Sequence, residues 1–184
     1  MKLKALTAVT GLTILGLAAS SACFATTKAQ LTARSDRTLE HFYTMNPANR
    51  HLADKAAGIL IFSRVTKGGI GVAGEYGEGV LEVNGGAVNY YSVGSASLGL
   101  TLGVGRHSEI IMFMTRDALA QFQNSQGWSV GADTAIAVVS TGAGGQYDSA
   151  TLDKPIIGFV FRQKGLIGDL SFEGSKITQI KTSD

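Results

Sequence analysis

Alternating bulky and small side chains predict that most of this chain is β-sheet. In residues 95–105 the even positions are apolar and the odd positions are serine, threonine or glycine. A period of two is typical of a strand, and a nearly bare face lets another backbone approach closely or lets the strand bend. Asn84-Gly85-Gly86 predicts a hairpin turn between two such segments. The predicted strands are 58–62, 69–83, 87–93, 96–104, 110–114, 130–139, 156–162, 166–172 and 177–180.

Helical periodicity occurs in three places. Residues 28–45 have apolar side chains near one face, and Asn46-Pro47 ends this helix and caps a second helix over about 47–56, with Gly58 as its C-terminal glycine. A third helix is predicted over 116–124. Because the strands follow one another without long helices between them, the pattern predicts an α+β fold. We expect a strongly curved, mostly antiparallel sheet or partial barrel with the N-terminal helices packed on one side.

Residues 1–22 have the pattern of an export signal, in which two lysines precede an uncharged, mostly apolar run and then small residues. The apolar run is short for a membrane span. Two kinds of processing stay open: cleavage before Cys23 with acylation of that cysteine, or ordinary cleavage after Ala22 or Ala25. Cleavage before Cys23 leaves a single domain, 23–184, and cleavage after Ala25 would shorten it by three residues; we expect this domain in the periplasm. Acylation would anchor the domain to a bilayer, in this case the outer membrane.

Charge and cysteine content exclude several classes of function. The formal net charge is +2, and removal of the two signal lysines leaves equal numbers of acidic and basic side chains. Bulk charge therefore does not favour nucleic-acid binding. Cys23 is the only cysteine, which excludes an intramolecular disulfide.

Residues 69–74 match the letters of a dinucleotide-binding fingerprint but not its context. That motif needs a helix opening at its third glycine, whereas Glu75 and Glu78 follow here among glycines and would repel phosphate. The glycines are therefore interpreted as bends in strands. Glu75, Glu78 and Glu82 could bind a cation together, but solvated strand edges are the favoured interpretation.

The sequence contains no recognisable catalytic or metal-ligating motif. His41, His51 and His107 are its only histidines, and none has a second histidine at metal-ligand spacing. We therefore predict no metal and no cofactor. A Gly-x-Ser-x-Gly elbow is absent from the sequence, although a hydrolase triad assembled across the fold stays open.

Five basic residues are candidates for binding phosphate. Lysines next to glycine turns can reach a phosphate while backbone N–H groups add donors, although two solvated lysines are the simpler interpretation. Further basic residues lie on the first predicted helix. The candidates are Lys28, Arg34 and Arg37 on that helix and Lys67 and Lys164 at the turns.

Several blocks with the right order and spacing resemble the SYLF family, also called Ysc84-like. They are 52–62, 67–81, 90–91 and 164–175, and 127–128 and 142–145 look like the bacterial branch of that family. The resemblance covers about residues 30–181. It implies a lipid-binding module, since eukaryotic members bind phosphoinositides and some bind actin, while bacterial members are exported and often lipoproteins. Eukaryotic members tend to carry a basic residue where Glu75 stands.

These observations together predict a non-enzymatic protein of the bacterial cell envelope that binds phospholipid or phosphoinositide head groups. The head-group phosphate would be held by the five basic candidates. One alternative is a protein–protein interaction or actin-binding module, and another is a periplasmic hydrolase.

Overall fold

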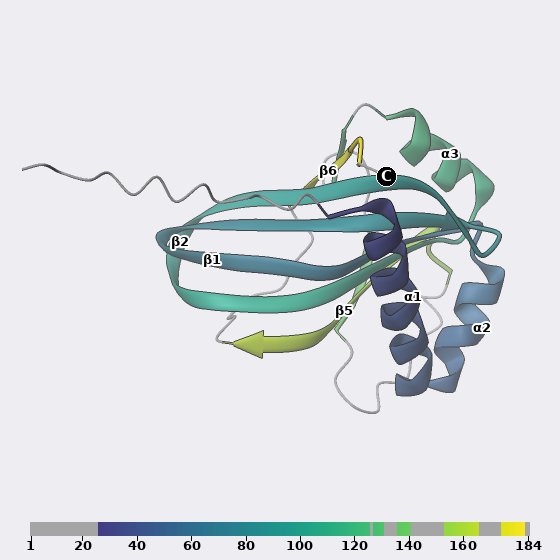
Figure 1. Ribbon diagram of the computed structural model, residues 1–184, viewed down its shortest axis with the longest axis horizontal. Helices are drawn as coiled ribbons and strands as arrows, with labels where there is room; N and C mark the ends of the chain where they lie inside the picture. Colours follow the sequence, from purple (N-terminus) through teal and green to yellow (C-terminus); the bar gives the residue numbers. More distant parts are fainter. Residues whose placement is uncertain (1–25, 126, 131–135, 141–152, 166–173, 183–184) are drawn as a thin grey trace, which may run out of the picture.

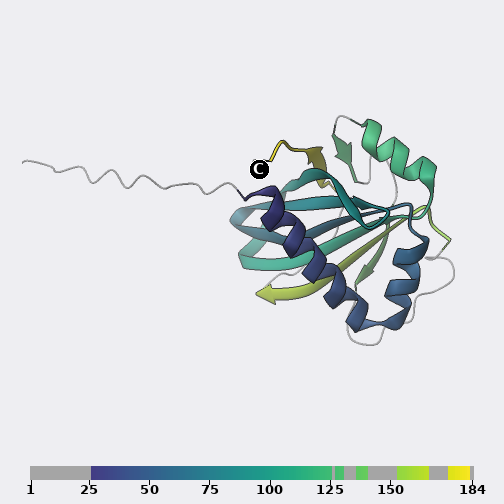
Figure 2. The ribbon, with the colours of Figure 1, turned by 45° about the vertical axis from the view of Figure 1, so that its right-hand side comes forward.

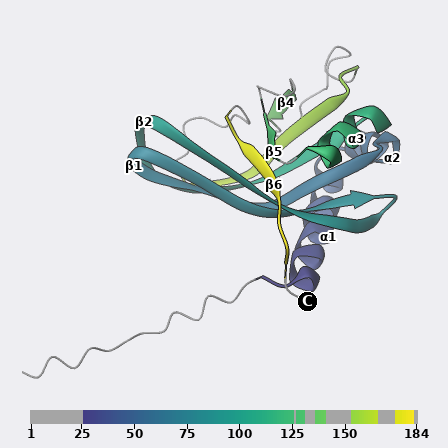
Figure 3. The same cartoon turned by 90° about the horizontal axis from the view of Figure 1, so that it is seen from above.

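The computed structural model describes residues 26–125, 127–130, 136–140, 153–165 and 174–182 (Figure 1). The predicted export signal, Cys23, the predicted strand 166–172 and the predicted loop 142–145 lie outside these ranges. The fold is α+β with a strongly curved, mostly antiparallel sheet, which confirms the predicted class (Figure 3). Along the chain the elements are α1 (Lys28–Met45), α2 (Pro47–Lys55), β1 (Gly58–Val83), β2 (Gly86–Phe113), α3 (Arg116–Asn124), β3 (Trp128–Ser129), β4 (Ala137–Ser140), β5 (Ile156–Gly165) and β6 (Lys176–Gln179).

β1 and β2 form one long antiparallel hairpin that turns back on itself (Figure 1). The strands pair from Gly58 with Phe113 to Val83 with Gly86, and the type I′ turn between them has positive φ at Asn84 (53°) and Gly85 (75°). The five short strands predicted between residues 58 and 114 are therefore wrong as separate elements. The two strands bend at shifts in their pairing register and not at loops, so each strand is continuous.

Glycine makes the doubling of this hairpin possible. At the bend, a Cβ on Gly69 would overlap the backbone of Val72. Where the two halves meet, a Cβ on Gly79 would lie 2.6 Å from the carbonyl oxygen of Ile61, and one on Gly77 would lie 2.9 Å from that of Arg64. The close backbone approach expected from the small-residue pattern thus occurs within one folded hairpin.

The rest of the sheet extends from β2 on both sides, and the curled sheet separates two apolar clusters. The strand order is β3-β6-β2-β5-β4, with β1 also paired to β2, and only the β4–β5 pair is parallel. The first cluster takes side chains from both halves of the hairpin and is covered by α3, whose Phe122 packs on Tyr91, Phe113 and Trp128. The apolar face of α3 is buried in this first cluster.

The second cluster lies on the opposite face of the sheet, beneath α1 and α2. Phe42 of α1 is fully buried there, with its ring centroid 4.8 Å from that of Phe159 and 5.3 Å from that of Phe161. Figure 2 shows α1 lying across the strands. The predicted packing of the N-terminal helices on one side is confirmed, and it places one edge of α1 beside residues 63–64 of β1, residues 106–108 of β2 and the end of β5.

The helix ends follow the predicted capping, with one exception. The Asn46 side chain accepts a hydrogen bond from the Ala48 N–H at 3.0 Å and caps α2, and Thr115 caps α3 in the same way. Gly58, predicted to end α2, instead begins β1, because α2 already ends at Lys55 with Ala56 as its C-cap. A Cβ at Gly58 would lie 2.8 Å from the side chain of Leu119, so glycine leaves room there for packing. None of the helices in the described ranges is long and apolar enough to cross a membrane.

Candidate anion-binding site

A cavity of about 460 Å³ lies between α1 and the strands β1, β2 and β5. We call it the basic pocket, because five arginines and a lysine line it and none of the described residues in its lining is acidic. This concentration of positive charge contrasts with a net charge of only +2 for the whole chain. The lining residues are Arg34, Arg37, Thr38 and His41 of α1, Ser63 and Arg64 of β1, Arg106, His107 and Ser108 of β2, and Arg162 and Lys164 of β5.

Helical spacing places the α1 side chains of the pocket together. Arg34, Arg37 and His41 are three and four residues apart and so share one face of the helix. This face borders the buried stripe that contains Thr38 and Phe42. The helix is therefore fixed to the sheet by its apolar side, while its basic edge borders the cavity that β1, β2 and β5 also line.

Sheet register brings the strand residues into the same cavity. Arg106 pairs with Thr66 on one side and with Lys164 on the other, so cations from neighbouring strands are adjacent. The end of β5 has unusual backbone angles, with a φ of 57° at Arg162 and 97° at Gly165. A Cβ at Gly165 would contact the backbone of Val104, so glycine allows β5 to continue beside β2 past Lys164.

The structure brings together three of the five predicted phosphate-binding residues. Arg34, Arg37 and Lys164 all line the basic pocket, whereas Lys28, at the start of α1, and Lys67, on β1, do not. Sequence reasoning missed Arg64, Arg106 and Arg162. Each lies in or beside an apolar strand, so only the order of the strands shows that they meet.

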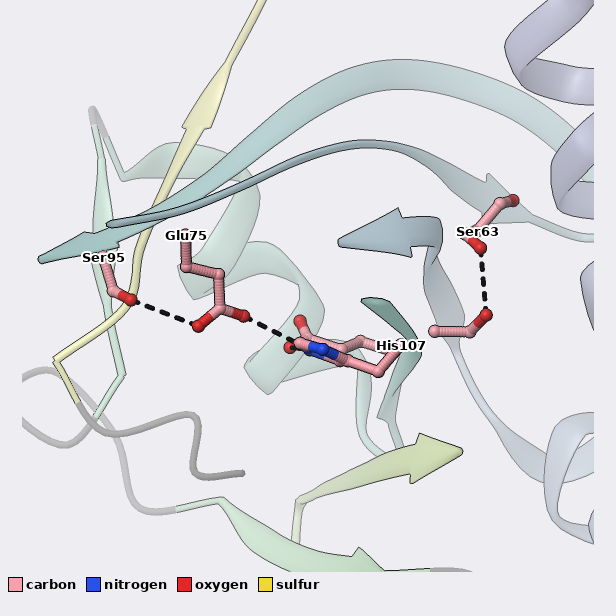
Figure 4. Close-up of polar contacts among 6 residues, drawn as sticks. Ser63, Glu75, Ser95 and His107 are labelled. Carbon is pink, nitrogen blue, oxygen red and sulfur yellow. Dashed lines mark hydrogen bonds and ion pairs between the residues drawn. The ribbon is translucent and has the colours of Figure 1, made fainter. Parts of the chain in front are cut away.

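His107 forms part of the pocket wall and links it to a buried cluster. Its Nε2 atom lies 2.7 Å from Oε1 of Glu109 and 3.2 Å from Oε1 of Glu75, and the Ser95 hydroxyl donates to the other Glu75 oxygen at 3.3 Å (Figure 4). The exposed fractions are 2% for His107, 3% for Glu109 and 8% for Glu75. We call these three residues the buried cluster.

The buried cluster changes the protonation of its members. Burial lowers the pKa of His107, but hydrogen bonds to Glu109 and Glu75 outweigh burial and raise that pKa from 6.5 to about 9. Burial also acts on Glu75, yet contacts with His107, the charge of Lys67 and the Ser95 hydroxyl hold its pKa below the usual value. Complete burial raises the pKa of Glu109 despite its contact with His107. The wall of the basic pocket therefore carries an imidazolium at neutral pH.

The favoured interpretation of three β1 glutamates as solvated residues is wrong for two of them. Glu75 and Glu82 are each only 8% exposed. The folded hairpin brings Glu75 against His107, while α1 covers the side of the sheet that carries Glu82, so that the charge of Asp36 acts on it. Alternation along a strand separates the faces of residues 75 and 82, so the three glutamates do not form one cluster.

The contacts of the three histidines involve carboxylates and solvent in the part of the chain that the structure describes. Nε2 of His107 faces two carboxylates, and the adjacent Ser108 hydroxyl donates instead to the backbone oxygen of Ser63 at 2.9 Å. His41 and His51 are exposed on α1 and α2. Among the described residues no hydrogen bond pairs a serine with a histidine as in a nucleophilic triad.

Comparison with known proteins identifies the family. Residues 94–184 match the family model Ysc84, described as Las17-binding protein actin regulator. The chain belongs to the Ysc84 family. This family, also called SYLF, is known for binding actin and lipids and is a family of binding modules, not of enzymes. The match begins within β2 and includes Arg106, His107, Arg162 and Lys164 of the basic pocket. No curated protein matches the chain.

Proposed function

We propose that this Ysc84 protein binds the phosphorylated head groups of membrane lipids without catalysing a reaction. The basic pocket is the observation that carries the proposal: six basic side chains line one cavity, and no acidic residue lines it in the part of the chain that the structure describes. Guanidinium groups bind phosphate oxygens with two parallel hydrogen bonds, and arginine is more weakly hydrated than lysine. A pocket with five arginines therefore favours a phosphate over a carboxylate or a neutral polar group.

The size of the basic pocket favours a head group with more than one anionic or polar part. Its volume of about 460 Å³ is within the usual range for small-molecule sites, roughly 300–1,000 Å³. A single phosphate would contact only some of the cations, because they come from four different elements. A phosphoinositide, in which several phosphates surround a polyol ring, would contact cations on the helix and on the strands together.

The place of action is also a proposal. The leader-like pattern of residues 1–22 supports export to the periplasm, and Cys23 is the residue on which an acyl anchor would be attached. A protein anchored in this way would be held next to phospholipid head groups. Anchoring would also compensate for a modest affinity of the domain itself, since its bulk charge is close to zero.

Vesicle flotation tests the proposed function. We expect the non-acylated protein to float with vesicles containing phosphatidylglycerol or phosphatidylinositol phosphates and to stay unbound with pure phosphatidylcholine. The double variant Arg34→Gln/Arg106→Gln should reduce binding to anionic vesicles at least tenfold. Arg116→Gln removes one exposed arginine from α3, outside the pocket, and should leave binding unchanged. Equal binding by both variants, or failure of the wild type to bind any anionic vesicle, would contradict the proposal.

A protein partner is the second candidate, because the family description names an actin regulator. Val72, Tyr76 and Val104 are apolar or aromatic side chains that are 56–65% exposed beside the bend of the hairpin. Such side chains are common at protein interfaces. Co-sedimentation with actin filaments tests this candidate, and it is favoured if Val72→Ser reduces sedimentation while flotation with vesicles is unaffected.

A further inference from the structure

The buried cluster contains the donor atoms of a metal site. One ligand atom each from Glu75, His107 and Glu109 lies within 4.8 Å of the others. The distances from Nε2 of His107 to the two carboxylates are 2.7 and 3.2 Å. A tetrahedral zinc ion with bonds of about 2.0–2.2 Å holds its ligand atoms roughly 3.3–3.6 Å apart. Small outward movements of these side chains would therefore create the coordination geometry.

An unpartnered oxygen inside the cluster points to a ligand. Two carboxylates and one imidazole share a buried site, and a buried polar atom needs a hydrogen-bond partner or a metal. The unpartnered atom is Oε2 of Glu109, which is buried and has no hydrogen-bond partner among the described residues, while Oε1 contacts His107. A divalent ion held by two carboxylates and a neutral imidazole would give a site of zero net charge. The unpartnered oxygen could then donate an electron pair to the ion.

The type of ligand restricts the choice of ion. Imidazole nitrogen suits zinc and its first-row neighbours, whereas magnesium and calcium prefer oxygen ligands alone. His107 also lines the basic pocket, so one member of the buried cluster borders this cavity. The charge of Lys67, which acts on Glu75, opposes the ion, and direct coordination by the two carboxylates must exceed this repulsion.

We propose that Glu75, His107 and Glu109 form a binding site for one divalent first-row transition-metal ion, with zinc as the best match. The proposal does not depend on what the basic pocket binds, because all three ligands belong to the folded hairpin. In such a site Nε2 of His107 would be the ligand nitrogen and Nδ1 would carry the proton. The ion would replace the imidazolium as the positive charge behind the pocket wall.

The test uses chelator-treated protein titrated with Co²⁺ and Zn²⁺. We expect one equivalent of Co²⁺ to give the visible absorption of a four- or five-coordinate ion and Zn²⁺ to displace it. Glu109→Gln and His107→Gln should each weaken binding at least tenfold. The matched controls Glu40→Gln and His51→Gln change exposed residues on α1 and α2 and should bind as tightly as the wild type. Each chain carries Cys23→Ser so that no thiol competes for the ion.

A second measurement needs no variant in the cluster and so does not depend on the folding of a mutant. The melting temperature of the Cys23→Ser protein should rise on adding Zn²⁺ and return after EDTA, whereas equal concentrations of Mg²⁺ should have no effect. The proposal is overturned if this protein takes up no Co²⁺ or Zn²⁺, or if Glu109→Gln, shown by circular dichroism to be folded, binds them with undiminished affinity.

Discussion

The two sides of His107 are built in opposite ways. On one side the basic pocket gathers exposed cations with no acidic partner among the described residues of its lining, and on the other the buried cluster holds two carboxylates away from water. Exposed cations stay hydrated, so gathering them costs little stability, whereas a buried carboxylate is tolerated only with a partner. The pocket is therefore suited to exchange ligands, while the cluster is a fixed part of the fold. Substitutions on the two sides should separate binding from stability.

The largest effect is expected from removing the shared histidine. His107→Leu leaves Glu75 and Glu109 facing each other in a buried site, and loss of one partner of a buried charged group costs about 3–5 kcal/mol. Urea unfolding in the presence of EDTA measures this difference without a contribution from metal. His51→Leu, at an exposed position on α2, should change stability by less than about 0.5 kcal/mol. A loss below 1 kcal/mol for His107→Leu would show that water enters the cluster freely.

Overpacking the folded hairpin should have the next largest effect, because both sides of His107 depend on the doubling of β1 and β2. Gly79→Ala places a methyl group 2.6 Å from the Ile61 carbonyl oxygen and against the ring of Phe62, which should destabilise the protein by about 1–3 kcal/mol. Gly74→Ala on the same strand meets nothing within 4 Å and is the matched control. Thermal unfolding compares the two variants, and equal melting temperatures would mean that the two halves of the hairpin are separated in solution.

A smaller effect is expected on lipid binding alone, and it should differ between the two lysines that lie beside glycines in the sequence. Lys164 lines the basic pocket, whereas the charge of Lys67 acts on Glu75 in the cluster. Lys164→Gln should weaken binding to anionic vesicles by about two- to tenfold, corresponding to roughly 0.4–1.4 kcal/mol. Lys67→Gln should weaken it less. Flotation at two salt concentrations measures both, and a larger loss for Lys67→Gln would place the lipid site outside the pocket.

The helices were predictable because their signals are local. The ends of α1 and α3 follow from apolar spacing, and the cap of α2 follows from Asn46-Pro47, all within a few neighbouring residues. The hairpin was only half predictable. Asn84 and Gly85 fixed its turn, but register shifts such as that between Ile70 and Val72 make continuous strands look like several short ones.

The site was less predictable than the fold, since it depends on contacts between distant segments. Helical spacing brings Arg34 and Arg37 together and is visible in the sequence, but their meeting with Lys164 requires the neighbouring position of β2 and β5. Glu75 and His107 meet only because the hairpin folds back on itself. The spacing of histidines along the chain therefore could not indicate the proposed metal site. Its other two ligands are glutamates, Glu75 on the paired strand β1 and Glu109 two residues after His107 on β2.

Glu82 offers the smallest and most specific test, because it is a buried β1 carboxylate that lacks the partner Glu75 has. Burial and the charge of Asp36 raise the pKa of Glu82, and its Oε1 atom has no hydrogen-bond partner among the described residues. A carboxyl whose pKa is higher in the folded state favours folding when protonated, so its contribution is lost as pH rises through that pKa. Glu82→Gln removes the charge and keeps the shape, and it should slightly stabilise the protein at neutral pH. The gain should disappear in acid, where the wild-type carboxyl is also neutral. Urea unfolding of both proteins from acidic to neutral pH measures the difference, and a Glu82→Gln variant less stable than the wild type at neutral pH would show that this carboxylate is as well compensated as Glu75.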